Sequence, residues 1–353
     1  MTALADIDTP AVLVDLDVAE ANIDRFQDYC NLHGFRNRPH IKTHKLPVLA
    51  RRQIKVGAVG VTCQKISEAE AMIAEGGVDD VLLTYNVVGS AKLQRLHALA
   101  GRVTLSVVAD SAAVVAGLGT EFAGASQPLS VLVECDTGAH RCGVATPTAA
   151  RDLATIIDRT DGVRFGGLMT YPPVGSTGAV QGFMSEAIEL CEAAGLTVER
   201  ITSGGAPDMW RAHEAPLVTE YRTGTYVYND RSLVERGVCT WDDCALTVLA
   251  TVVSVPDTGR AIIDAGTKVL TSDLLGLDGH GHVLGRPDIR IDQLSEEHGR
   301  LVCDGPIGLS VGDRVRIVPN HCCVVSNMMD AVVAVRGTRV EGDLAIAARG
   351  QVW

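Results

Sequence analysis

The stretch VGVTCQKISEAEAMIAEGGVDDVLLTY, residues 59–85, contains the unit from which most of the chain is built. It begins and ends with short β-type runs, VGVTC (59–63) and VLLTY (81–85). Between them, SEAEAMIAEGG (67–77) carries apolar residues at helical spacing and ends at glycine, as helices commonly do. The stretch therefore predicts one strand–helix–strand unit.

The same alternation extends over residues 38–226, and further helix-type segments such as SEAIELCEAAGL (185–196) separate the β-type runs. Eight strands separated by helices predict a parallel (β/α)8 barrel of the α/β class rather than an open sheet. A dinucleotide-binding Rossmann fold is disfavoured, because no Gly-rich fingerprint follows the first strand. The eight runs are RPHIK (38–42), VGVTC (59–63), VLLTY (81–85), VTLSVVAD (103–110), LSVLVECD (129–136), VRFGGLMTY (163–171), VERITSGG (198–205) and VTEYRTGTYVY (218–228).

The last third of the chain follows a different pattern. After about residue 234 the strand-like runs lack long helices between them, which predicts a smaller, mainly β domain. The run AVLVDLD (11–17) precedes the first barrel strand, and we expect it to join this C-terminal sheet. We therefore expect residues 25–232 to form the barrel and residues 1–24 plus 233–353 to form the β domain.

Composition excludes several classes of function. The 353 residues carry a net charge of −12 without a Lys/Arg-rich run, which disfavours nucleic acid and anionic membranes as partners. Hydrophobic residues make up 46% and charged residues 21%, the balance of a globular chain. No apolar run is long enough to span a bilayer and the N-terminus does not resemble a signal peptide. We expect a soluble, cytoplasmic protein whose ten cysteines are reduced.

Polar residues gather at the predicted C-terminal ends of the barrel strands, where barrel enzymes have their active sites. Each alone is compatible with an ordinary loop residue, but their convergence on one rim favours a functional site. They are Lys42, Gln64, Tyr85, Arg141, Tyr171, Ser203, Gly204, Gly205 and Tyr226.

Lys42 is the candidate nucleophile on this rim. A lysine at a barrel mouth, among apolar and cationic neighbours, is suited to form a Schiff base. Lys45 is the rival, but we expect it to lie on the following helix and to be less well aimed. The turn at residues 203–205 offers backbone amides to a phosphate, although a plain tight turn explains it equally well when taken alone. Lysine and phosphate cradle together fit pyridoxal phosphate.

A candidate metal pair lies in PNHCC (319–323). If this segment is a strand, His321 and Cys323 lie on one side of it and Cys322 on the other. Imidazole and thiolate suit Zn²⁺, although two ligands alone are a weak pattern because structural zinc sites usually have four. By contrast, His280 and His282 lie in a Gly-rich loop (274–285), where we expect them to face solvent.

Eight motifs together give the chain a resemblance to a known family. They are DTP before AVLVDLD, RPHIKTHK, CQKISEAEA, ECDTGAHRCGV, the SGG turn, EYRTGTYVYND, IDAGTK and PNHCC. In this order they resemble the D-threonine aldolase/D-serine dehydratase family, fold-type III pyridoxal-phosphate enzymes with an alanine-racemase-like barrel and a β domain. The resemblance also implies a homodimer.

The resemblance further implies roles for the rim residues. Lys42 would carry the cofactor as an aldimine, Arg141 would lie near its phenolic oxygen, and Tyr171 would lie against its ring. Gln64 belongs to the cofactor-binding residues that we expect, and the residues implied around the phosphate are Ser203, Gly204, Gly205 and Tyr226.

The resemblance also bears on the metal and the reaction. It implies a divalent metal on His321 and Cys323. By the same resemblance, aldolases of the family have a His-x-Asp pair here with Mn²⁺ or Mg²⁺, and dehydratases have a His-x-Cys pair with zinc. Cys323 therefore favours a dehydratase. Aldolases of the family tend to have a histidine just beyond the tyrosine, where this chain has PPVGS (172–176).

The leading hypothesis is a metal-dependent lyase that converts D-serine, D-threonine or a related D-3-hydroxy-α-amino acid to a 2-oxo acid and ammonia. Three alternatives stay open at this point. An aldolase would release glycine and an aldehyde, a racemase would need a base on each face of the cofactor and no metal, and a pyridoxal-phosphate carrier would lack turnover.

Overall fold

The computed structural model describes residues 4–353, and it has the predicted α/β architecture with a second, mainly β part. The chain forms two compact units, and each is described by itself. The barrel unit comprises Phe26–Lys42, Pro47–Gly224 and Gln351–Trp353. The β unit comprises the described residues up to Arg25, Thr43–Leu46 and Thr225–Gly350.

The barrel unit is built on eight parallel strands. Their order is β2-β9-β8-β7-β6-β5-β4-β3, and a parallel bridge between His40 and Thr62 links the two ends of the sheet. The amide of Val59 adds a 2.9 Å hydrogen bond to the carbonyl of Asn37 along the same seam. The strands are β2 (Arg36–Asn37), β3 (Val61–Cys63), β4 (Asp80–Leu83), β5 (Thr104–Ala109), β6 (Leu129–Cys135), β7 (Val163–Thr170), β8 (Ile201–Gly204) and β9 (Glu220–Arg222).

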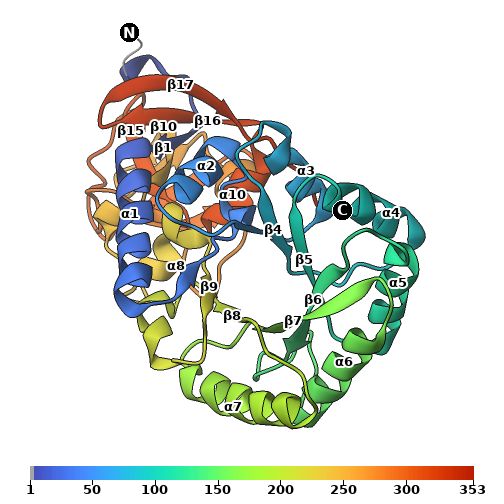
Figure 1. Ribbon diagram of the computed structural model, residues 1–353. Helices are drawn as coiled ribbons and strands as arrows, with labels where there is room; N and C mark the ends of the chain where they lie inside the picture. Colours follow the sequence, from blue (N-terminus) through green and yellow to red (C-terminus); the bar gives the residue numbers. More distant parts are fainter. Residues whose placement is uncertain (1–3) are drawn as a thin grey trace. The chain divides into compact units, whose positions relative to one another are not determined.

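Helices surround this sheet, as Figure 1 shows for α3 to α7. Local signals fix where they begin: α6 starts after Thr146, whose hydroxyl accepts from the amide of Ala149 at 3.1 Å, with Pro147 in the first turn. None of the helices in residues 4–353 is both long and apolar enough to cross a membrane. The helices from the N-terminus to β8 are α1 (Leu16–His33), α2 (Pro47–Lys55), α3 (Ile66–Ala74), α4 (Ser90–Ala100), α5 (Ala112–Phe122), α6 (Pro147–Arg159) and α7 (Thr177–Ala193).

Apolar side chains from neighbouring strands form a layer of the barrel core. Leu82, Val108, Leu132 and Met169, one each from β4, β5, β6 and β7, are at most 1% exposed. These strands are buried on both faces, which explains why they appear in the sequence as nearly continuous apolar runs.

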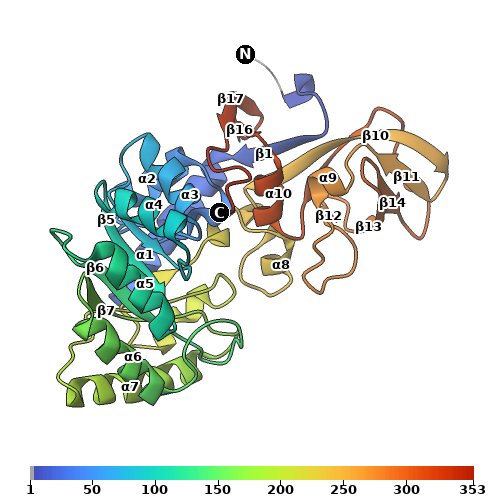
Figure 2. The same ribbon diagram turned by 90° about the vertical axis from the view of Figure 1, so that its right-hand side faces the viewer.

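The β unit contains a nine-stranded sheet, which includes the N-terminal strand β1 (Ala11–Asp15). This strand pairs antiparallel with β10 and parallel with β16, so the expectation that residues 11–17 join the C-terminal sheet is confirmed. Figure 2 shows the long β10 with β11 and β14 beside it. The other strands are β10 (Leu246–Asp257), β11 (Arg260–Ile263), β12 (His282–Val283), β13 (Arg290–Leu294), β14 (Gly299–Val302), β15 (Arg314–Val318), β16 (Ala331–Arg336) and β17 (Arg339–Ala345).

Three short helices of the β unit carry residues that matter below: α8 (Arg231–Val234), α9 (Thr267–Leu270) and α10 (Cys322–Met328).

The predicted runs 38–42 and 218–228 are not continuous strands in the structure. β2 (Arg36–Asn37) lies before the first of these runs, of which only His40 forms a bridge, to Thr62, and residues Ile41–Thr43 form a 3₁₀ turn. Pro39 has no amide hydrogen and cannot donate to a neighbouring strand, although the amides of Arg38 and His40 on either side of it donate to the carbonyls of Tyr221 and Thr223 at 2.9 Å. Likewise β9 ends at Arg222, and residues Thr225–Val227 form a second 3₁₀ turn.

Candidate active site

Lys42 presents an unengaged amine on the barrel unit. Its side chain is exposed and has no hydrogen-bond or ion-pair partner within residues 4–353. Its backbone amide donates to His40 Nδ1 at 3.3 Å, and His40 Nε2 lies 3.3 Å from Gln64 Oε1. Gln64 Nε2 in turn donates to the carbonyl of Thr84 at 3.0 Å. The turn that carries Lys42 is therefore tied, through His40 and Gln64, to the C-terminal ends of β3 and β4.

Lys45 is not the helical residue that the sequence suggested. It lies before α2, which begins at Pro47, and its φ of 53° is in the left-handed region. Its side chain is buried and Nζ donates to Asn327 Oδ1 at 2.7 Å. The amine of Lys45 is thus engaged in a structural hydrogen bond, whereas that of Lys42 is available for chemistry.

Arg141 and Tyr171 contact each other at the same edge of the sheet. Tyr171 is the first residue after β7 and is 40% exposed, and the guanidinium carbon of Arg141 lies 4.7 Å from the centre of its ring. This cation–π contact orients an exposed arginine that would otherwise have many rotamers. Another rim tyrosine, Tyr85, is covered by Lys65, whose Nζ lies 3.6 Å from the centre of its ring.

The Ser-Gly-Gly turn ends β8 with almost no room for side chains on its backbone. Ser203 is buried, and a Cβ added to Gly204 would lie 2.1 Å from the carbonyl oxygen of Arg222. Gly205 has φ +139° and open space where a Cβ would point. A backbone that is bare on its open side fits a phosphate, which binds through close approach to main-chain amides.

The sequence also places Tyr226 with these residues, at a strand end. In the structure Tyr226 is buried in the 3₁₀ turn Thr225–Val227 and belongs to the β unit, whereas residues 203–205 belong to the barrel unit.

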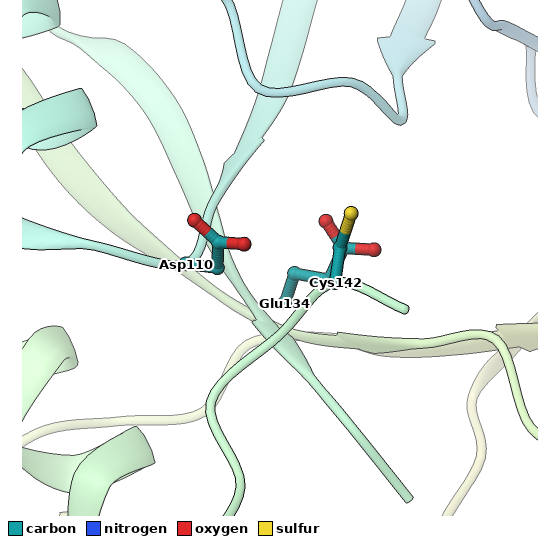
Figure 3. Close-up of side chains that lie close together, drawn as sticks. All are labelled: Asp110, Glu134 and Cys142. Carbon is teal, nitrogen blue, oxygen red and sulfur yellow. The ribbon is translucent and has the colours of Figure 1, made fainter. Parts of the chain in front are cut away.

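An acidic group on the rim was missed by the sequence reasoning. One ligand atom each from Asp110, Glu134 and Cys142 lies within 4.8 Å of the others (Figure 3). Burial and Asp110 raise the pKa of Glu134, while the charges of Arg141 and Arg222 lower it. Burial and the two carboxylates raise the pKa of the Cys142 thiol, which disfavours the thiolate that a metal would bind. The signal was present in the sequence, since Asp110 ends one predicted strand and Glu134 lies near the end of the next.

Arg222 is the buried counter-charge beneath this rim. Its Nε donates to Thr202 Oγ1 at 2.9 Å and Nη2 to the carbonyl of Thr170 at 2.5 Å. Burial lowers its pKa to about 10, which leaves it cationic at neutral pH. Two carboxylates and two guanidiniums therefore give the rim a balanced set of charges.

The predicted metal pair is not on a strand. β15 ends at Val318, and His321 is the N-cap of α10, whose first turn contains Cys323. The two side chains nevertheless interact, because the turn at a helix start brings residues i and i+2 close. Burial lowers the pKa of His321, but a hydrogen bond and the charge of Cys323, together with Asp273, raise it to about 9. Hydrogen bonds from Cys322, His321 and Thr43 hold the pKa of Cys323 well below its usual range, so it is a thiolate.

Further groups in the β unit support these two donors. Thr43, the residue after Lys42, has its Oγ1 3.2 Å from Cys323 Sγ. Asp273 Oδ2 lies 2.6 Å from His321 Nδ1, so Nε2 is the ring nitrogen that is left for Cys323 or a cation. A thiolate and an imidazole with one free nitrogen fit a soft divalent cation such as Zn²⁺.

The second histidine pair is packed rather than solvent-facing. The ring of His282 stacks on Trp241 with centroids 3.8 Å apart and an interplanar angle of 12°, and His280 is half-buried. Burial lowers the pKa of both histidines. Aromatic packing accounts for His282, and the expectation that His280 and His282 face solvent was wrong, since both are half-buried.

Comparison with known proteins identifies the chain at family level. Residues 14–232 match the family described as "Alanine racemase, N-terminal domain", and residues 245–335 match "Putative serine dehydratase domain". A D-threonine aldolase from Arthrobacter sp. is 34% identical over 98% of this chain and 94% of its own length. A D-threo-3-hydroxyaspartate dehydratase from Delftia sp. strain HT23 is 32% identical over 94% of this chain and 95% of its own.

Solved structures give the same picture. The crystal structure of a D-threonine aldolase from Filomicrobium marinum superposes with a TM-score of 0.92 at 33% identity, over 99% of this chain and 98% of that one. A metal-free form of a cysteine-to-alanine mutant of D-threo-3-hydroxyaspartate dehydratase superposes with a TM-score of 0.87 at 31% identity, over 98% and 99% of the two chains.

Fold and family matches together define an enzyme of the fold-type III, pyridoxal-phosphate-dependent class. More narrowly, the chain belongs to the D-threonine aldolase/D-serine dehydratase family, whose members are lyases, and the resemblance drawn from its motifs is confirmed.

Proposed function

We propose that the protein is a dehydratase that converts D-serine, D-threonine or a related D-3-hydroxy-α-amino acid to a 2-oxo acid and ammonia, using pyridoxal phosphate and a divalent cation, with zinc favoured. The observation that carries this proposal is the pairing of the Cys323 thiolate with His321, a donor set for a soft Lewis acid. A relative named as a dehydratase has a cysteine whose replacement accompanies a metal-free form. Mn²⁺ and Mg²⁺, which prefer oxygen ligands, suit this pair less well.

The residues proposed for the cofactor fit it in chemistry. Lys42 would hold the aldehyde carbon, and the turn of Ser203, Gly204 and Gly205, which is open at Gly205, would receive the phosphate. The proposed set of cofactor residues is completed by Gln64, Arg141, Tyr171 and Tyr226. The contact between Arg141 and Tyr171 orients both of these side chains. When bound, pyridoxal phosphate supplies an electron sink for negative charge at Cα, and a divalent cation supplies a Lewis acid for the departing hydroxyl.

The side chains of this protein would then handle the protons. Lys42 Nζ, once freed by the incoming amino group, is the candidate base for the proton on Cα. His40 accepts the backbone amide of Lys42 and so holds its turn in place during this transfer. Arg141 and Arg222 lower the pKa of Glu134 and so favour its carboxylate form beside the proposed cofactor residues.

Aldol cleavage is the second candidate, because aldolases are among the relatives at 34% and 33% identity. Cleavage of Cα–Cβ requires a base for the proton of the β-hydroxyl. Directly after Tyr171 this chain has Pro172 and Pro173, which cannot accept a proton. That substitution favours dehydration over cleavage.

The deciding experiment incubates the pyridoxal-phosphate-loaded protein with D-threonine, with and without EDTA, and assays 2-oxobutyrate and glycine separately. The proposal expects 2-oxobutyrate that disappears with EDTA and returns with zinc. Glycine and acetaldehyde would make the protein an aldolase, and EDTA-insensitive racemisation would make it a racemase. Size-exclusion chromatography with light scattering tests the homodimer that the family resemblance implies.

A further inference from the structure

Asp273 contacts the proposed metal ligand His321 from a distant part of the sequence. It lies in the loop that follows α9, and its Oδ2 is 2.6 Å from His321 Nδ1. The two side chains are 35% and 25% exposed, so this hydrogen bond is partly shielded from solvent. It is the length of a charge-assisted hydrogen bond, and nothing in the family motifs noted in the sequence includes this aspartate.

Asp273 is held in place by its own loop. Thr271 adopts φ +64°, in the left-handed region, and its hydroxyl accepts the backbone amide of Asp273 at 3.2 Å. The helix before this turn is anchored in turn, because the amide of Thr267 donates to the carbonyl of Ser295 at 2.8 Å. The carboxylate is therefore presented to His321 by a fixed backbone rather than by a flexible side chain alone.

The other nearby carboxylate is already committed elsewhere. Asp230 caps α8 through Leu233 and Ser232, and its Oδ2 accepts the amide of Cys322 at 3.1 Å. It fixes the start of α10 and leaves Asp273 as the carboxylate that contacts the imidazole.

We propose that Asp273 is the positioning residue of the metal site: it binds Nδ1–H of His321 and so holds the ring in the tautomer and orientation that direct Nε2 to the cation. A carboxylate on the far nitrogen of a ligating histidine fixes its tautomer and raises its basicity. Thr43 does the corresponding work for the other donor, with its hydroxyl 3.2 Å from Cys323 Sγ. This inference rests on the proposed function only in that it requires His321 to bind a cation.

The test measures zinc binding to the full-length, cofactor-loaded protein in the absence of substrate. The variants are Asp273→Asn and Asp273→Ala, with Asp278→Asn as the matched control, since Asp278 lies on the next stretch of the same loop and its side chain is 89% exposed. Competition with a chromophoric chelator gives the Kd, and elemental analysis gives the number of ions per chain. The thermal midpoint of each metal-free variant is recorded beside them.

We expect Asp273→Ala to bind zinc about 10- to 100-fold more weakly, since loss of such a partner typically has this effect. The Kd of Asp273→Asn for zinc should lie between those of Asp273→Ala and the wild type, because its amide oxygen can still accept Nδ1–H. Each variant should still bind one ion per chain at zinc concentrations well above its Kd, and metal-free midpoints should match the wild type.

Two outcomes overturn the inference alone: a wild-type Kd in Asp273→Ala, or no ion in that variant at any zinc concentration, which would make Asp273 a ligand itself. A wild-type chain that binds no zinc would overturn this inference together with the metal part of the proposed function. Glycine as the product from D-threonine would overturn only the proposed reaction and leave the zinc titrations standing.

Discussion

Glu220→Gln is the change whose effect can be worked out in most detail. Glu220 begins β9, and its Oε2 lies 2.9 Å from Arg38 Nε and 3.7 Å from Arg200 Nη1. The side chains of Glu220 and Arg38 are 0% and 3% exposed. β9 pairs with β2, so this ion pair lies beside the seam at which the two ends of the barrel sheet meet.

The magnitude follows from what the substitution leaves behind. Among the ion pairs of residues 4–353, Arg200 is paired with Glu220 alone, so glutamine at position 220 leaves Arg200 without an ion-pair partner. Arg38 keeps its second partner, Asp80, at 2.6 Å. Removing one partner of a buried ion pair typically costs about 3–5 kcal/mol, because the remaining charge is buried without compensation. We therefore expect a loss of about 3–5 kcal/mol near neutral pH.

The pH dependence gives this prediction its sign. Burial raises the pKa of Glu220, but the charges of Arg38 and Arg200 lower it by more than burial raises it. The folded-state pKa of Glu220 therefore lies below the ~4.3 of a free glutamate. Its contribution to stability is therefore complete above the unfolded-state pKa and is lost as the pH falls through the lower folded-state pKa. The difference between wild type and Glu220→Gln should shrink as the solution is made more acidic than about pH 4.

Urea unfolding followed by far-UV circular dichroism over a pH series measures both effects. Glu75→Gln is the matched control, because the pair of Glu75 with Arg51 at 3.0 Å is exposed and such pairs contribute about 1 kcal/mol or less. The reasoning is refuted if Glu220→Gln loses no more stability than Glu75→Gln, or if its loss is the same in acid as at neutral pH.

Three further predictions concern the site and the core. Lys42→Ala should lose covalently held pyridoxal phosphate and lower turnover by about 10²-fold or more. Lys45→Met should keep the cofactor, because the amine of Lys45 is engaged by Asn327 whereas that of Lys42 has no partner in residues 4–353. Absorbance after gel filtration and a rate assay compare the two variants. At the same free zinc concentration, Cys323→Ala should bind far less zinc than the control variant Cys303→Ala, which changes another cysteine of the same unit. Equal metal contents of the two variants in elemental analysis would contradict the metal assignment. Leu132→Ala should destabilise the barrel by about 2–5 kcal/mol in urea unfolding, since it empties part of a core layer that is at most 1% exposed, and a loss below about 1 kcal/mol would contradict the packing described here.

The pattern of the sequence was sufficient for the architecture. Eight apolar β-type runs, separated by segments with helical periodicity, led to the barrel because strands and helices are recognisable from spacing over a few residues. The same local pattern led to β1 joining the C-terminal sheet. Local pattern failed where the backbone turns: Lys42 and His321 were placed on strands, but lie in a 3₁₀ turn and at a helix N-cap.

Only the tertiary structure decided which of these candidates have partners. Lys45 is engaged by a residue 282 positions away and Cys323 by one 280 positions away, and the partner of His321 lies 48 positions before it. Hydrogen bonds over such separations depend on how the chain folds back on itself, and no short-range periodicity encodes them. The residue types thus indicated the chemistry, while folding determined that the amine of Lys42 is available and that His321 has one nitrogen left for a cation.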